Sequence, residues 1–461
     1  MSGGHGTSRT FVGFGFGPIQ AGLFLYEAFR SGNFQRFVVA EVVPEVVNAV
    51  RRAGGQYSVN IAYSDRVKTE RIGPVEIADP ATEPDRTLLV EAVAEAEEIA
   101  TALPSVQHYT SNAPGSVHRI LAEGLRKKAA SGAARAVVYA AENHNRAAEI
   151  LEAEVQRTVP QDERDRVRSR VRFLNTVIGK MSGVVADTED MRRRALAAVV
   201  PTVPQAFLVE SFNRILISRI CFEGARGQPA FRRGITVFEE KHDLLPFEEA
   251  KLYGHNSTHA LAAYIGAFRG KKRIADLADA PGLLAFLEAA FLHESGETLI
   301  RRHKGVDGLF TSEGYRDYAL DLLARMVNPY LGDTVSRVAR DPARKLEWDD
   351  RLTGIIRLAL HYGVPTPRYA LGAAAALALL YPAALNPETP VTALFDALWS
   401  KAAPDTAEKE IVAGIVERGL RHLRLWRDCG FPDLEDFINQ PDIRQSSSSL
   451  SVSLDQRTDV N

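Results

Sequence analysis

Three polar residues of different chemistry stand at fixed intervals in the stretch KLYGHNSTHALAAYIG, residues 251–266. Lys251, Asn256 and His259 lie at offsets 0, 5 and 8, and an alanine-rich apolar run typical of a packed helix follows. On one continuous α-helix, Asn256 would lie about 140° and His259 about 80° round from Lys251, with Glu248 about 60° round on the same side. A lysine whose pKa is lowered by burial could act as a base, while an asparagine amide could stabilise a developing alkoxide and a histidine could bind a hydroxyl.

Two simpler explanations compete with this catalytic interpretation. Lys251 could be a helix lysine that extends its ammonium to solvent, with His259 a hydrogen-bonded core histidine, and spacing alone favours this explanation. His255 and His259, at i and i+4, could instead supply half of a metal site. The glutamate of an H-E-x-x-H motif is missing and no third-ligand motif follows, so we expect no metal.

A glycine-rich loop near the N-terminus is the second candidate site. FVGFGFGPIQAGLFLYEAF, residues 11–29, lies between a strand-like run and a helical pattern. Its first glycine would permit a tight turn, its second would let the backbone approach a pyrophosphate, and the helix N–H groups would bind the anion. A glutamine stands where the simplest G-x-G-x-x-G spacing places the third glycine. The residues that we predict to contact a dinucleotide here are Gly15, Phe16, Gly17, Pro18, Ile19, Gln20 and Gly22.

An acidic residue follows the second strand-like run, RFVVAEVV. Glu41 lies 19 residues after Gly22, where a carboxylate would accept hydrogen bonds from the adenine ribose and repel a 2′-phosphate. This favours NAD over NADP as the cofactor. The alternative is a glycine-rich turn without a ligand, with Glu41 as a solvated strand end.

Length and composition limit the class of protein. At 461 residues the chain predicts two domains, and its 45% hydrophobic and 25% charged residues are those of a soluble globular protein. The net charge of -2 gives no reason to expect nucleic acid or an anionic membrane as a partner. Only two cysteines and no N-terminal apolar segment favour a reducing, cytoplasmic location. The apolar run 369–381 is too short for a membrane span and predicts a buried helix.

Strand-like and helical patterns alternate first, and long amphipathic patterns follow. The alternation predicts an α/β Rossmann-type domain over residues 1–204, with a β insertion in the stretch 57–79. Strands are expected within 10–17, 36–43, 105–115, 134–143 and 170–179, and helices over 82–103, 278–303 and 406–426. We expect a mostly α-helical domain over 205–442 and a disordered serine-rich tail over 443–461.

Several motifs resemble one known family. EEAKLYGHNSTHALAAYIG resembles the signature helix, K-x-x-x-x-N-x-x-H, of the polyol-specific long-chain dehydrogenases and reductases, the mannitol dehydrogenase family. NPYLGDTVSRVARDPARKLEWDDRL, residues 328–352, is similar to the segment typical of members that act on mannitol 1-phosphate. With AAEN, FLNTVIGKM and HESGETLIRRH, the resemblance covers most of residues 10–380, although the loop GFGPIQAG departs from the family's usual sequence.

The resemblance implies roles for individual residues. Lys251 would be the general acid/base, Asn256 and Asn175 would form the oxyanion hole, and His259 would bind and orient the substrate. Glu248 would help the lysine exchange its proton with water. Basic residues corresponding to Arg337 and Lys345 contact substrate in the family, and the predicted cofactor site also includes Asn112 and Asn143. The family further implies NAD(P) chemistry without a metal and is often monomeric, so we expect a monomer.

A local cluster of positive charge is the basis for predicting the substrate. It consists of Arg337, Arg340, Arg344 and Lys345. Such clusters are usually solvated helix ends, but guanidinium groups also bind phosphate in bidentate fashion. We therefore expect a phosphorylated small-molecule substrate, with mannitol 1-phosphate and fructose 6-phosphate interconverted.

Three alternatives remain open. Within the family, the chain could be an unphosphorylated polyol dehydrogenase or a hexuronate reductase. From another class, it could be a non-catalytic module that senses NAD or a sugar phosphate. A short-chain dehydrogenase is excluded, because none of the 13 tyrosines is followed at the fourth position by lysine. A zinc-dependent enzyme fits poorly with two scattered cysteines.

Overall fold

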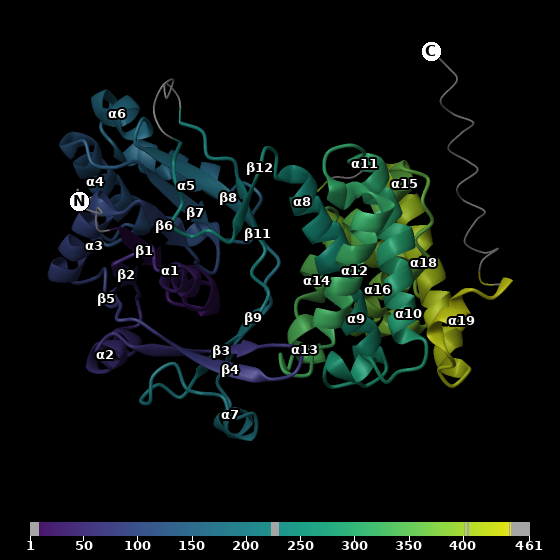
Figure 1. Ribbon diagram of the computed structural model, residues 1–461. Helices are drawn as coiled ribbons and strands as arrows, with labels where there is room; N and C mark the ends of the chain where they lie inside the picture. Colours follow the sequence, from purple (N-terminus) through teal and green to yellow (C-terminus); the bar gives the residue numbers. More distant parts are fainter. Residues whose placement is uncertain (1–8, 223–229, 401, 403–404, 442, 444–461) are drawn as a thin grey trace, which may run out of the picture. The chain divides into compact units, whose positions relative to one another are not determined.

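The chain forms two compact units, Met1–Leu245 and Pro246–Asn461, each described here by itself (Figure 1). The computed structural model describes residues 9–222, 230–400, 402, 405–441 and 443. Almost all of the tail for which we expect disorder, residues 444–461, lies outside the described residues.

An eight-stranded sheet with the order β12-β11-β8-β7-β6-β1-β2-β5 forms the centre of the N-terminal unit. Its strands are β1 (Thr10–Phe14), β2 (Arg36–Ala40), β5 (Glu76–Ala78), β6 (Glu98–Thr101), β7 (Ala136–Ala140), β8 (Val171–Ile178), β11 (Ile215–Ser218) and β12 (Phe238–Lys241). The six strands from β5 to β8 are parallel, and β11 joins β8 in antiparallel fashion. Their spatial order is that of the doubly wound dinucleotide-binding folds. The predicted Rossmann-type domain is therefore confirmed.

The central strands are mostly apolar because both faces of the sheet are covered. Phe11 and Val39 belong to one hydrophobic core, whereas Val12 and Val38 belong to a second one. Successive strand residues point to opposite faces, so each strand contributes to both cores. The helices of this unit are α1 (Leu25–Ser31), α2 (Pro44–Arg52), α3 (Glu83–Glu95), α4 (Val117–Ser131), α5 (Ala147–Thr158), α6 (Arg164–Arg168) and α7 (Thr188–Arg193), with a π-helical turn, η1 (Gln20–Phe24), directly before α1.

A second, four-stranded sheet has the order β4-β3-β10-β9. It contains β3 (Tyr57–Ala62), β4 (Val67–Ile72), β9 (Ser182–Val185) and β10 (Ala206–Glu210). The antiparallel pair β3 and β4 is the strand pair predicted from the alternating stretch 57–79, whose last residues form β5 of the main sheet instead.

The predicted strand at 105–115 is wrong. Residues Val106–Tyr109 form a 3-10 turn, and the strand of this region is β6, inside the stretch 82–103 that we expected to be entirely helical. All four residues of β6 are buried, so the strand shows no polar alternation that would separate it from a helix end.

The division between the units also lies later than the expected boundary at residue 204. It falls between Leu245 and Pro246, because β10, β11 and β12 pair with strands of the N-terminal unit. β10 and β11 pair with β3 and β8, which come earlier in the chain. Such pairing cannot be predicted from the short apolar runs of the segment itself.

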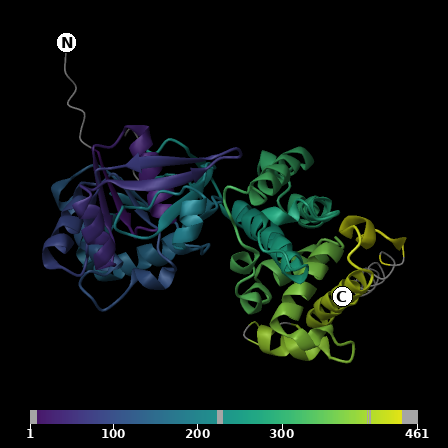
Figure 2. The ribbon, with the colours of Figure 1, turned by 90° about the horizontal axis from the view of Figure 1, so that it is seen from below.

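The second unit consists of helices (Figure 2, teal to yellow). They are α8 (Leu245–Glu249), α9 (Ser257–Phe268), α10 (Leu283–Ala289), α11 (Glu297–Arg302), α12 (Ser312–Met326), α13 (Val335–Val338), α14 (Pro342–Lys345), α15 (Arg351–His361), α16 (Pro367–Leu380), α17 (Val391–Trp399), α18 (Thr406–Asp428) and α19 (Leu434–Ile438), with π-helical turns η4 (Ala250–Asn256) and η6 (Ala290–Gly296). The alanine-rich α16 is almost completely buried, as predicted. Small residues allow this, since Gly372 lies against Leu261 of α9 and Gly419 of α18 lies against the carbonyl oxygen of Ala370. Among the described residues, none of the helices has both the length and the apolar character needed to cross a bilayer.

Candidate active site

The glycine loop opens onto a cavity of about 730 Å³ in the N-terminal unit. This volume is in the range of small-molecule and cofactor sites. The cavity lies at the carboxyl ends of β1, β2 and β6, where doubly wound sheets bind their ligands. Six of the predicted cofactor residues are part of its lining: Gly15, Phe16, Gly17, Pro18, Ile19 and Glu41.

The two loop glycines meet different physical requirements. Gly15 has a positive φ of 84°, and a Cβ atom there would lie 2.8 Å from the carbonyl oxygen of Ala102. Gly17 lines the cavity, and a Cβ atom there would meet no atom within 4 Å. Gly15 is therefore required for the turn itself. At Gly17, a residue of the cavity lining, the missing side chain leaves open space, as the approach of a pyrophosphate requires.

Glu41 follows β2 and organises the rim of the cavity. Its carboxylate accepts hydrogen bonds from the main-chain N–H groups of Phe16 (3.1 Å), Val42 (2.7 Å) and Val43 (2.9 Å). A carboxylate offers about four acceptor positions, so it can still accept a hydrogen bond from a ribose hydroxyl. A negative charge at this position also disfavours a 2′-phosphate. The loop, the cavity and this carboxylate together fit NAD.

Four other predicted cofactor residues are not part of this lining. Gln20 is fully buried in η1, and its amide points at Gly13, where a Cβ atom would lie 2.1 Å from Nε2. Gly22 allows η1 to approach the second sheet, because a Cβ atom there would lie 2.6 Å from Val209. Asn112 and Asn143 are exposed loop residues. The third glycine of the motif thus serves helix-to-sheet packing.

Glu142, directly before Asn143, is a residue of this region that we did not predict. Its buried carboxylate accepts hydrogen bonds from the Thr101 hydroxyl (2.9 Å), the Leu103 N–H (2.9 Å) and the Tyr109 hydroxyl. Burial raises the pKa of this carboxyl. Glu142 holds the loop after β6, which lines the cavity through Leu103. Its position two residues after the end of β7, in AAEN, was the available signal.

In the helical unit, Lys251 lies in an interrupted helix. The run from Leu245 to Phe268 is α-helical at both ends, but residues Ala250–Asn256 form the π-helical turn η4. The angles expected for a continuous α-helix are therefore wrong, since i→i+5 bonding adds one residue to each turn. π-Helical turns of this kind occur frequently at functional sites.

The surroundings of Lys251 favour its neutral form. The side chain is partly buried, and burial lowers its pKa to about 8. The charge of Arg351 lowers this pKa further, whereas that of Glu248 raises it. Lysine with such a pKa can gain and lose a proton near neutral pH, as a general acid/base must. These surroundings argue against the alternative that Lys251 extends its ammonium group to solvent.

The two histidines of η4 and α9 differ in their surroundings. Burial, followed by the charge of His259, lowers the pKa of His255 well below its ordinary value, so His255 is neutral. Nε2 of His259 lies 3.5 Å from Oδ2 of Asp333, whose Oδ1 accepts a hydrogen bond of 2.6 Å from Nε of Arg337. Burial opposes ionisation of Asp333, but His259 and Arg337 together hold its pKa below the ordinary value. Among the described residues there is no group of three or more metal-ligating side chains.

Asn175 belongs to the N-terminal unit, at the middle of β8. Its side-chain oxygen accepts a hydrogen bond from the N–H of Ala148 (2.8 Å), and its amide donates to Glu149 (2.8 Å). Asn175 thus caps the first turn of α5. Asn256 belongs to the helical unit, lies five residues after Lys251 and is partly buried.

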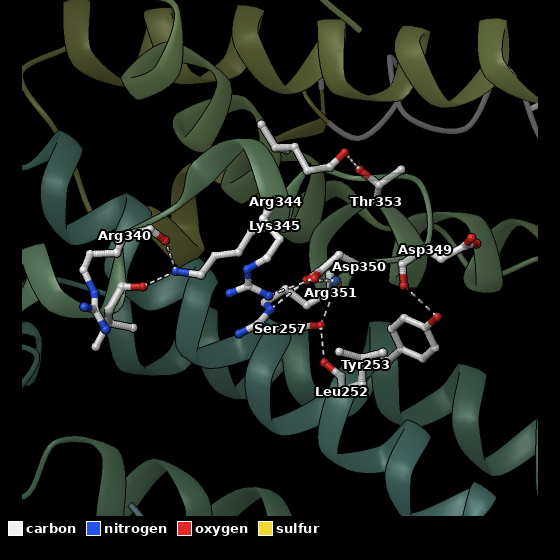
Figure 3. Close-up of polar contacts among 12 residues, drawn as sticks. Leu252, Tyr253, Ser257, Arg340, Arg344, Lys345, Asp349, Asp350, Arg351 and Thr353 are labelled. Atoms are coloured by element: carbon white, nitrogen blue, oxygen red, sulfur yellow. Dashed lines mark hydrogen bonds and ion pairs between the residues drawn. The ribbon is translucent and has the colours of Figure 1, made fainter. Parts of the chain in front are cut away.

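The predicted basic cluster divides into residues with different partners, and Figure 3 shows those of Arg344 and Lys345. Arg337 pairs with Asp333, and Arg340 is exposed and donates to the carbonyl oxygen of Arg337 (3.2 Å). Nζ of Lys345 is buried and donates to the carbonyl oxygens of residues 338 and 340. Arg344 donates to Oδ2 of Asp350 at 3.0 Å.

We did not predict a role for Arg351, Asp350 or Ser257 from the sequence. Nε of Arg351 donates to Oδ1 of Asp350 (2.8 Å), so one carboxylate holds both Arg344 and Arg351. The Ser257 hydroxyl lies 2.8 Å from the carbonyl oxygen of Leu252 and 2.6 Å from that of Arg351. It thereby links η4 to the start of α15. The segment EWDDRL contains both Asp350 and Arg351. Ser257 of α9 lies against Arg351 only through tertiary packing, which the segment itself does not reveal.

Comparison with known proteins agrees with this arrangement. The family model described as the mannitol dehydrogenase Rossmann domain matches residues 9–226, and that of the mannitol dehydrogenase C-terminal domain matches residues 243–418. The chain is 30% identical over 352 residues to a mannitol-1-phosphate 5-dehydrogenase of Bacillus licheniformis, covering 76% of this chain and 83% of the relative.

Two solved structures share the fold. A substrate-free D-sorbitol dehydrogenase superposes with a TM-score of 0.70 at 15% identity, covering 92% of this chain and 94% of the other. The ternary complex of Pseudomonas fluorescens mannitol 2-dehydrogenase with NAD and D-mannitol gives 0.60 at 16% identity, covering 96% and 91%. With both family models matched in order and a relative at 30% identity over most of its length, the chain belongs to the mannitol dehydrogenase family of NAD-dependent polyol dehydrogenases.

Proposed function

We propose that this protein interconverts a polyol phosphate and a ketose phosphate by reversible, NAD-dependent hydride transfer. The pair we propose is mannitol 1-phosphate and fructose 6-phosphate. The Bacillus licheniformis relative carries the name of this activity. The basic residues around Asp350 support a phosphorylated substrate, because guanidinium groups match phosphate oxygens in charge and geometry.

The observation that carries the proposal is a lysine with a pKa of about 8 in a π-helical turn. During oxidation, neutral Lys251 takes the proton of the substrate hydroxyl as the carbon-bound hydrogen leaves as hydride. Bound NAD would supply the two-electron acceptor for that hydride. During reduction, the Lys251 ammonium returns its proton to the oxygen of the ketose. Both directions need this group, and a pKa near the working pH populates both forms.

Neighbouring residues support the proton transfer. The proposed amide donors to the substrate oxygen are Asn175 and Asn256, which would stabilise the alkoxide as charge develops. His259, held near Asp333, would orient a second hydroxyl. Glu248 shares the electrostatic environment of Lys251 and is the proposed route for proton exchange with water.

Four substrates separate the possible activities. NADH oxidation is measured by absorbance with fructose 6-phosphate, fructose, fructuronate and tagaturonate. We expect activity with fructose 6-phosphate to exceed the others. Preference for fructose or a hexuronate would overturn the phosphate assignment and leave the proposed roles of Lys251 and its neighbours intact. Inactivity with all four, together with NADH binding, would favour the sensing module.

One observation supports the unphosphorylated alternative. Asp333 and Asp350 already pair with arginines of the cluster, so part of its positive charge is neutralised without a ligand. A substrate without a phosphate would need only the remaining hydrogen-bond donors. The comparison of fructose 6-phosphate with fructose decides between these two readings of the cluster.

A further inference from the structure

We propose that Arg344 and Arg351, together with the hydroxyl group of Tyr264, form the subsite that binds the phosphate group of the substrate. The inference rests on the proposed function and assigns the phosphate to particular residues. All three side chains belong to the helical unit, from α14, α15 and α9.

One carboxylate holds the two guanidinium groups side by side (Figure 3). Asp350 accepts Nε of Arg351 at 2.8 Å on one oxygen and Nη1 of Arg344 at 3.0 Å on the other. A guanidinium has five N–H donors, and each of these bonds uses a single one. The pair also keeps one uncompensated positive charge. Pre-oriented donors and excess charge are what a phosphate group requires.

The electrostatics of nearby residues show that positive charge is in excess here. The pKa of Lys345 is lowered to about 8 by burial and then by the charges of Arg351 and Arg344. The charge of Arg351 also lowers the pKa of Lys251, and Asp341 and Asp350 only partly compensate at Lys345. An anion bound between the arginines would relieve this repulsion.

Tyr264 supplies an independent indication of a ligand. Its side chain is 1% exposed, and its hydroxyl has no hydrogen-bond partner among the described residues. A buried hydroxyl without a partner is costly. Burial raises the pKa of this hydroxyl, the charges of Arg351 and Arg344 oppose that rise, and Nζ of Lys345 lies 5.5 Å from the ring centroid. A phosphate oxygen between the arginines would accept the missing hydrogen bond.

The two other cations that the family resemblance suggests have protein partners of their own and are not part of the proposed subsite. Arg337 is bound to Asp333, beside His259. Lys345 donates to two main-chain carbonyl oxygens and so closes the turn between α13 and α14. Both residues shape the segment that presents Arg344, whose side chain is 46% exposed and open to an incoming ligand.

The subsite is mechanically linked to the acid/base residue. The Ser257 hydroxyl lies within hydrogen-bond distance of the carbonyl oxygens of Leu252, next to Lys251, and of Arg351. The distance between the phosphate and the reacting hydroxyl is therefore set by two adjoining elements, η4 and the first turn of α15. A rigid spacing of this kind would select substrate length.

The test compares phosphorylated and unphosphorylated ketose in three variants, Arg344→Met, Arg351→Met and Tyr264→Phe. We expect the ratio of kcat/KM for fructose 6-phosphate to that for fructose to fall about 10- to 100-fold for each arginine and about 5- to 10-fold for Tyr264→Phe. Arg427→Met is the matched control, because Nε of this exposed α18 arginine donates to Asp428 at 2.9 Å. It should leave the ratio unchanged.

Tyr264→Phe is the variant least expected to misfold, because it removes only a hydroxyl group that has no hydrogen-bond partner among the described residues. Its melting temperature should equal or exceed that of the wild type. A wild-type preference for fructose 6-phosphate that all three variants retain would overturn the subsite and leave the proposed function standing.

A wild type without that preference would overturn the proposed function instead. Calorimetric titration with inorganic phosphate would then decide the subsite separately. Binding that is weakened in the arginine variants supports it, and absent or unaltered binding refutes it.

Discussion

The cofactor cavity and the surroundings of Lys251 use different parts of the chain. The cavity is lined by glycines and mostly apolar side chains, with Glu41 fixing the loop through three main-chain N–H groups. The region of Lys251 depends on charged side chains from α8, η4, α14 and α15. Main-chain recognition needs a particular turn, which a short sequence specifies. Acid/base chemistry by a side chain needs charged neighbours that shift its pKa, and these neighbours come from distant segments of the chain.

Removing the base should produce the largest effect. We expect Lys251→Met to lower kcat about 10²- to 10⁴-fold in both directions, because one group serves both proton transfers. NADH affinity, measured by fluorescence titration, should be retained, since the cavity is built by the N-terminal unit. Lys304→Met, at an exposed position, is the control. Near-normal turnover of Lys251→Met would exclude it as the acid/base.

Glu41→Ala should weaken NADH binding about 10- to 100-fold, with kcat at saturating NADH little changed. The variant leaves the N–H groups of Phe16, Val42 and Val43 without their acceptor and removes the charge that disfavours a 2′-phosphate. Discrimination between NADH and NADPH should therefore fall. Titrations of both nucleotides measure it, with Glu45→Ala, an exposed neighbour, as control. Unchanged discrimination would remove Glu41 from the cofactor site.

The two loop glycines allow stability and binding to be separated. Gly15→Ala should lower the free energy of unfolding by about 1–3 kcal/mol, because alanine is strained at φ 84° and close to Ala102. Gly17→Ala should keep the melting temperature but weaken NADH binding, since its methyl group enters only the cavity side. Thermal unfolding and NADH titration of both variants test this. Full NADH affinity in Gly17→Ala would contradict the assigned approach of the pyrophosphate.

The pH dependence of turnover should move in opposite directions in two variants. Oxidation requires neutral Lys251 and should decline as the pH falls below about 8, whereas reduction requires the ammonium and should decline above it. Arg351→Met removes a positive neighbour and should shift both profiles to higher pH. Glu248→Gln removes a negative neighbour and should shift them to lower pH. Shifts in the same direction, measured at saturating substrate, would exclude electrostatic control of Lys251.

Much of the N-terminal unit could be predicted from local patterns. The strands β1, β2, β7 and β8 and the turn at Gly15 follow from short apolar runs and from the need for a positive φ. The pattern did not separate β6 from α3, because four buried residues carry no periodicity. Nor did it assign β10 to β12 to this unit, since strand partners are not visible in a single segment.

The sequence by itself determined the types and order of the chemical groups: a glycine loop before an acidic residue, then a lysine, an asparagine and a histidine at fixed intervals. Tertiary structure decided the surroundings of those groups. It placed a π-helical turn at Lys251 and the charge of Arg351 beside it. It also gave Arg337 and Lys345 protein partners, since Asp333 and the carbonyl oxygens of the α13–α14 turn lie against them. Local sequence specifies a turn through the backbone angles that its residues allow, whereas burial and pairing of charges depend on segments that meet only in the folded chain.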